Sequence, residues 1–134
     1  HMTVVIRMIT EGSLNTISAF GDKSSCELFE FFEEQRKVRL GEMKRLYRLF
    51  ARTADKGVPN NNELVRFFNK EGIFEFKTRG GLRVFAFWDK GRLIICTNGF
   101  VKKKQKTPRR EIKKAVACKK AYFKAKDDDD IIYE

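Results

Sequence analysis

The sequence predicts an α+β domain in which helices pack on one face of an antiparallel sheet. Two observations carry this prediction. Apolar residues recur at helical intervals within residues 25–54, whereas after Gly72 they fall into three short β-rich segments separated by tight turns. The chain has 134 residues, of which 42% are hydrophobic, enough for one core. We therefore expect a single domain over residues 1–134.

The N-terminal half is predicted to form a strand and then a helical hairpin. Residues 3–10 are β-branched and apolar, which indicates a strand. Ser24 and Glu27 have capping-box spacing, so a helix is expected from about Ser25 towards Arg39, with Gly41 breaking or bending it. A second helix is predicted by an apolar stripe made of Met43, Leu46, Tyr47, Phe50 and Ala54. Residues 56–62 are rich in turn formers and predict a loop before a short segment at 64–68.

The C-terminal half is predicted to form a three-stranded antiparallel meander and a final helix. The strands are expected at residues 73–78, 82–89 and 92–97, with Gly-containing turns between them. Thr107 and Pro108 suggest an N-cap and a first helical residue. Residues 127–134 carry only acidic charges, which favours a frayed, solvated tail; the alternative is a tail that folds back over a basic surface.

Charge points to a polyanionic partner. Lys and Arg number 29 against 18 acidic residues, a net charge of +11, and most of the basic residues follow residue 71. Lys77, Arg79 and Arg83 should meet across one turn and form a cationic groove with the basic residues that follow the third strand. Such a groove suits RNA phosphates, although a charge run can also be an ordinary solvated surface.

Arg83 is unusual because it interrupts an otherwise apolar strand. A buried guanidinium is costly unless it is paired or faces a cleft. The residue is therefore expected either to bind or act on a substrate, or to form a structural ion pair.

The remaining composition favours a cytoplasmic protein without a bound metal or other cofactor. Its three cysteines are far apart and form no CxxC pair, and no segment has the length and apolarity of a membrane span or a signal peptide. His1 precedes Met2 and is interpreted as a cloning remnant, which leaves no other histidine in the chain.

Four segments occur in an order that resembles the HigB-like, phage-derived branch of the RelE/ParE superfamily, the toxins of type II toxin-antitoxin pairs. They are residues 74–77 (FEFK), 81–85 (GLRVF), 93–103 (LIICTNGFVKK) and 105–112 (QKTPRREI). The resemblance implies a RelE-like, microbial RNase-like fold. It also implies an endoribonuclease that cuts translated mRNA on the ribosome and is silenced by a cognate antitoxin, which we expect to be acidic.

The resemblance also bears on the site. Arg83 matches the strand arginine of the family and Lys102 and Lys103 its paired lysines, whereas Asn98 stands where many relatives have histidine. The predicted catalytic residues are Lys77, Arg79, Arg83, Lys102 and Lys103. The predicted RNA-binding residues are Asn98, Lys104, Lys106, Arg109 and Arg110.

Metal-free RNA cleavage needs a base for the 2′-hydroxyl, cations for the phosphorane and an acid for the 5′-oxygen. Lys77 is the candidate base because neighbouring positive charge lowers a lysine pKa, with Glu75 as the alternative. Lys102 or Lys103 is the candidate acid, unless both only anchor phosphates.

Two other functions remain open at this point. The chain could be a non-catalytic domain that binds RNA or an antitoxin, as the missing histidine favours, or a gyrase inhibitor of the ParE kind.

Overall fold

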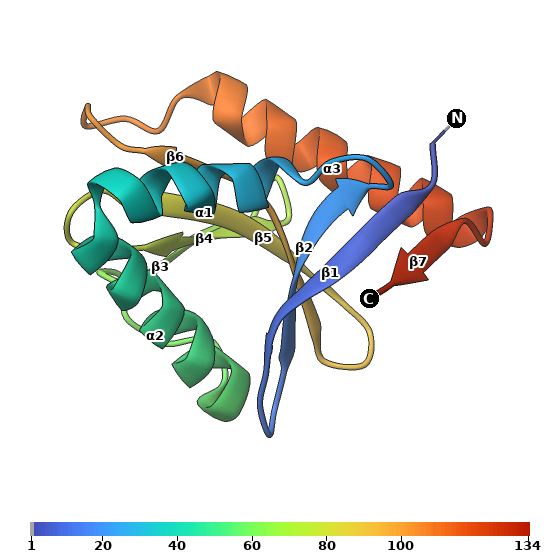
Figure 1. Ribbon diagram of the computed structural model, residues 1–134, viewed down its shortest axis with the longest axis horizontal. Coiled ribbons are helices and arrows are strands. Elements are labelled where there is room, and N and C mark those ends of the chain that lie inside the picture. Colours follow the sequence, from blue (N-terminus) through green and yellow to red (C-terminus); the bar gives the residue numbers. More distant parts are fainter. Residues whose placement is uncertain (1) are drawn as a thin grey trace.

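A seven-stranded sheet with three helices forms the molecule (Figure 1). The computed structural model describes residues 2–134, so His1 lies outside the described residues. The elements are β1 (Val4–Glu11), β2 (Thr16–Asp22), α1 (Glu27–Val38), α2 (Leu40–Lys56), β3 (Val65–Phe68), β4 (Ile73–Lys77), β5 (Leu82–Asp89), β6 (Leu93–Val101), α3 (Arg109–Asp127) and β7 (Ile131–Tyr133). The strand order is β3-β4-β5-β6-β2-β1-β7.

The predicted α+β class is confirmed, but the predicted sheet was too small. The meander β4-β5-β6 is present and antiparallel, yet it is only the middle of the sheet. β3 adds one edge, and β2, which was not predicted, joins the meander by pairing parallel to β6. The sheet is therefore mixed, and the expected RelE-like topology does not match in detail. β6 also continues through Asn98 and Gly99 to Val101, four residues beyond its predicted end.

The sheet separates two hydrophobic layers. On one face, α1 and α2 pack against alternate residues of the strands, including Phe76, Val84 and Ile94. On the other face, α3 packs against the intervening residues, including Phe85 and Phe87. Because side chains alternate across a strand, the backbone positions of Glu75, Lys77 and Arg83 also belong to the α3 face.

The predicted helical hairpin is present, but its helices begin and end at other residues than predicted. The chain breaks at Arg39 rather than at Gly41, which lies in the first turn of α2. The Ser24 capping box was wrong: α1 has Cys26 at its N-cap without a side-chain cap, because the carboxylate of Asp22 accepts bonds from the backbone N–H groups of Ser24 and Ser25. At α3 the cap is Pro108 rather than Thr107.

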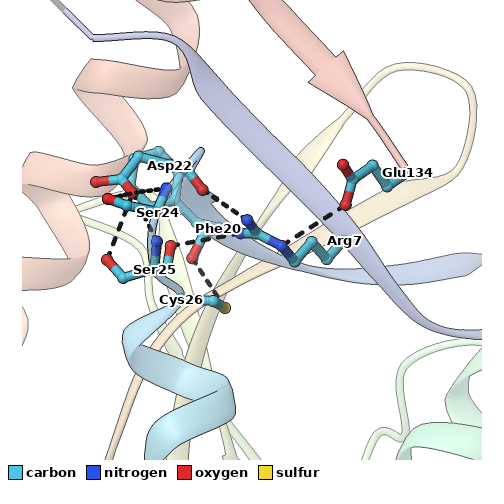
Figure 2. Close-up of polar contacts among 7 residues, drawn as sticks. All are labelled: Arg7, Phe20, Asp22, Ser24, Ser25, Cys26 and Glu134. Carbon is cyan, nitrogen blue, oxygen red and sulfur yellow. Dashed lines mark hydrogen bonds and ion pairs between the residues drawn. The ribbon is translucent and has the colours of Figure 1, made fainter.

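The acidic C-terminal residues are neither frayed nor folded over the basic surface. They lead into β7, which pairs parallel to β1 at the far edge of the sheet (Figure 1). Figure 2 shows that Arg7 of β1 contacts both the end of β2 and the C-terminal residue. Its guanidinium donates to the carbonyl of Asp22 at 2.7 Å and lies 3.7 Å from the carboxylate of Glu134. Apolar residues of this segment, including Ile131 and Tyr133, pair with β1. The acidic charge of residues 127–134 alone does not predict this strand.

Within residues 2–134, no helix combines the length and apolarity needed to cross a membrane.

Candidate functional site

The turn between β4 and β5 brings three predicted cations into one pocket. Lys77, Arg79 and Arg83 line a cavity of about 430 Å³ together with residues from α2 and from the segment before β3. Lys77 and Arg83 lie on adjoining strands, as predicted, and the structure makes them direct partners in the strand register. The other lining residues are Arg45, Leu49, Glu63, Leu64 and Thr78.

Arg83 sits deep in this site. Its side chain is 11% exposed, and one terminal nitrogen donates to the carbonyls of Thr78 and Leu82, each at 2.9 Å. Its Nε lies 4.0 Å from a carboxylate oxygen of Glu75. Arg83 therefore both lines the pocket and lies beside a buried carboxylate.

Glu75 is fully buried, and neither of its carboxylate oxygens has a hydrogen-bond partner among the described residues. Burial raises the pKa of Glu75, and the nearby cations Arg83, Lys102, Arg66 and Lys77 oppose this rise. A carboxylate with no exposed surface is not accessible to a ligand in the pocket. Glu75 and Arg83 attract each other electrostatically, but no hydrogen bond joins their side chains.

The raised pKa makes folding stability depend on pH. The folded protein binds the Glu75 proton more tightly than the unfolded chain, so stability is lost as pH rises from the unfolded pKa through the folded pKa. Glu75→Gln should remove this fall and be the more stable protein at neutral pH. Urea unfolding from about pH 4 to 8 checks it, with the exposed Glu34→Gln as control. Parallel curves for wild type and Glu75→Gln would contradict the assignment.

The surroundings of Lys77 lower its pKa. Desolvation lowers the pKa of Lys77, and Arg83 and Lys102 lower it further, whereas Glu75 opposes the shift. Its ammonium donates to the carbonyl of Asn62 at 2.7 Å, which fixes the side chain at the pocket wall. A lowered pKa of Lys77 was predicted from neighbouring positive charge, but the largest cause of the lowering is desolvation.

Glu42 of α2 braces the β4-β5 turn and was missed by the sequence analysis. Its carboxylate accepts bonds from the Thr78 hydroxyl at 2.5 Å and the Gly80 N–H at 2.7 Å, and it pairs with Arg45 at 2.6 Å. These three contacts lower the pKa of Glu42 although its burial acts to raise it. Because Arg83 donates to the Thr78 carbonyl, the contacts of Glu42 with this turn also help to position Arg83.

Neither Lys102 nor Lys103, both predicted to be catalytic, lines the pocket, but Lys102 contacts the β4-β5 turn through its backbone. Its N–H donates to the Gly81 carbonyl at 2.7 Å, and a Cβ at Gly81, whose φ is +101°, would lie 3.0 Å from the Lys102 carbonyl oxygen. Only glycine suits this left-handed conformation and close approach. Lys103, Lys104 and Lys106 are exposed on the segment between β6 and α3.

None of the predicted RNA-binding residues lines this pocket. Asn98 is 1% exposed, and its amide bonds to the Thr97 hydroxyl and to the backbone and carboxylate of Glu111, so it ties β6 to the start of α3. We leave Asn98 out of the proposed site because it has no free polar edge. Arg109 lines a separate cavity of about 380 Å³ along α3, and exposed Arg110 pairs with Glu111.

No three His, Cys, Asp or Glu side chains among residues 2–134 are grouped as metal ligands.

Comparison with known protein families assigns the chain. Residues 29–120, more than half of its length, match the family described as phage-derived protein Gp49-like (DUF891). The chain belongs to this family. Gp49-like proteins are toxins of toxin-antitoxin pairs, which implies an antitoxin partner. No curated protein matches the sequence. The matched region contains every residue that lines the pocket of this Gp49-like chain.

Proposed function

We propose that this Gp49-like chain is a cytoplasmic toxin of the HigB-like branch, which cuts translated mRNA on the ribosome. The observation that carries the proposal is the convergence of Lys77, Arg79 and Arg83 on one pocket, with Arg83 shielded from water at its base. A partly desolvated cationic pocket binds a phosphodiester strongly and stabilises the charge that develops on a phosphorane.

The residues divide the chemistry among them, without a metal or cofactor. Neutral Lys77 accepts the proton of the 2′-hydroxyl, whose oxygen attacks the adjacent phosphorus and displaces the 5′-oxygen. Arg83 stabilises the pentavalent transition state, while Arg79 holds a flanking phosphate. Lys102 or Lys103 gives a proton to the leaving oxygen. The products are a 2′,3′-cyclic phosphate and a 5′-hydroxyl.

Lys77 as base predicts a pH profile. A lysine accepts a proton only when it is neutral, so cleavage should accelerate as pH rises through the pKa of Lys77. Because that pKa is lowered, the acceleration should occur at lower pH than for an ordinary lysine. The rate of cleavage in a reconstituted translation reaction measures this, and Lys77→Arg should abolish the acceleration. An identical profile in Lys77→Arg would assign the proton to another group.

The exposed lysines Lys104 and Lys106, together with Arg110, extend the positive surface from β6 to the start of α3. We propose that they contact phosphates of mRNA or ribosomal RNA outside the pocket. An acidic antitoxin would compete for the same surface by charge complementarity.

One observation favours a second candidate, a non-catalytic RNA- or antitoxin-binding domain. Arg83 and Lys77 both donate to backbone carbonyls and so contribute to structure as well as to charge. A gyrase inhibitor of the ParE kind is a further alternative, and it would induce DNA damage without cutting mRNA.

Inducible expression in a bacterial host separates these functions. Growth, new mRNA 5′ ends and induction of the DNA-damage response are followed together. The proposal expects growth arrest with new 5′ ends inside translated frames and no damage response. Arrest without cuts would support binding alone, and arrest with damage would support gyrase inhibition.

A further inference from the structure

The edge strand β3 carries a cation and an aromatic ring on the same face as the pocket cations. Arg66 pairs in register with Glu75, and Phe68 pairs with Ile73. Both therefore point to the α3 face, as Glu75, Lys77 and Arg83 do. α3 packs mainly on β5, β6, β1 and β7, and its Lys119 reaches the β3-β4 turn by donating to the Gly72 carbonyl, while Arg66 on β3 stays exposed.

Arg66 and Phe68 form a stacked pair. The Arg66 guanidinium lies over the Phe68 ring, 4.4 Å from its centroid, and Arg66 is exposed. Phe68 is held from below by Phe85, with the two ring centroids 5.5 Å apart at an interplanar angle of 77°. Within residues 2–134, none of the ion pairs involves Arg66. One face of the Arg66 guanidinium therefore lies on the Phe68 ring, and the opposite face is not paired with a carboxylate of the described residues.

The pair lies within reach of the reacting groups. Arg66 lowers the pKa of both Glu75 and Lys77, so it belongs to the same electrostatic cluster. β5, which carries Arg83, is two strand spacings from β3, roughly 10 Å across the sheet. A single RNA strand held at Lys77 and Arg83 can therefore extend a neighbouring nucleotide over β3.

We propose that Arg66 and Phe68 form a subsite that stacks one unpaired base of the RNA bound at Lys77 and Arg83. Unpaired bases stack on arginine planes and aromatic rings, and lysine, although it keeps the charge, lacks this planar surface. The subsite rests on the proposed function and deepens it, because it would give the pocket a preference for base-bearing single strands and for particular bases next to the cut.

The test uses two uncleavable oligonucleotides of equal length: a 2′-O-methyl single-stranded RNA and its abasic counterpart. Wild type should bind the base-bearing strand more tightly. Arg66→Lys should lose about fivefold or more of that affinity and bind the abasic strand unchanged. Arg52→Lys, at an exposed position of α2, is the matched control and should behave as wild type. Thermal unfolding confirms that each variant is folded.

Three results would overturn the subsite. They are equal affinity of wild type for the two strands, an unchanged Arg66→Lys, and a loss in Arg66→Lys that is the same for both strands, which would make Arg66 a phosphate contact. The mRNA 5′ ends give an independent readout: Arg66→Lys should broaden the base preference at the cuts. Cuts with an unchanged preference would count against the subsite alone, whereas a wild type that makes no cuts would refute the nuclease itself.

Discussion

Arg83→Ala is expected to abolish growth arrest and to lower mRNA cleavage by about 100- to 1,000-fold, the usual loss when one preorganised transition-state donor is removed. Arg83 is the deepest cation of the pocket and its side chain is only 11% exposed, so water cannot replace it efficiently. The measurement is the cleavage rate on translating ribosomes, with Arg52→Ala on α2 as an exposed control.

The effect of Arg83→Ala on folding must be separated from its effect on catalysis. Arg83→Ala leaves Glu75 buried without its partner, which should lower the free energy of unfolding by about 1–3 kcal/mol. Adding Glu75→Gln removes the orphaned charge and should recover much of that stability while cleavage stays lost. If the double variant regains cleavage together with stability, Arg83 is a structural residue and the catalytic assignment fails. Parallel losses of cleavage and RNA affinity in a folded Arg83→Ala would indicate binding alone.

Glu42→Ala is expected to reduce cleavage by about 10- to 100-fold although Glu42 does not line the pocket. The change removes the acceptor for Thr78 and Gly80, so the β4-β5 turn that carries Arg79 loses its anchor to α2. Arg83 is displaced with it, because it donates to the Thr78 carbonyl. Cleavage rates and RNA affinity should be measured together: a misplaced turn should lower the rate more than the affinity.

Glu42→Gln is the matched variant. Its amide oxygen can still accept from Thr78 or Gly80, so cleavage should stay within a few-fold of wild type even though the ion pair with Arg45 is gone. Similar losses in Glu42→Gln and Glu42→Ala would show that negative charge matters rather than the anchoring of the turn. Unchanged cleavage in both variants would show that the contacts of Glu42 with the turn do not affect catalysis.

The local pattern of the sequence determined the elements of the second half. Leu82 to Asp89 forms β5 with the predicted bounds, because its alternation and flanking turns are local signals. The same signals place Lys77 and Arg83 on adjoining strands across one turn, and the structure adds that they are register partners. Net charge and the order of the short motifs are sufficient to indicate a toxin of a toxin-antitoxin pair. These inferences need only neighbours in the chain.

The tertiary structure alone decided which distant segments meet. β2 is stabilised by parallel pairing with β6, and β7 by parallel pairing with β1, and neither partner is near in sequence. Glu42 reaches the turn at Gly80 across 38 positions, and Arg66 lies beside Glu75 only because β3 pairs with β4. Asn98 was expected at the RNA surface, but packing of α3 on β6 buries it. Long-range pairing and burial depend on the summed packing of the whole chain, so no local pattern records them.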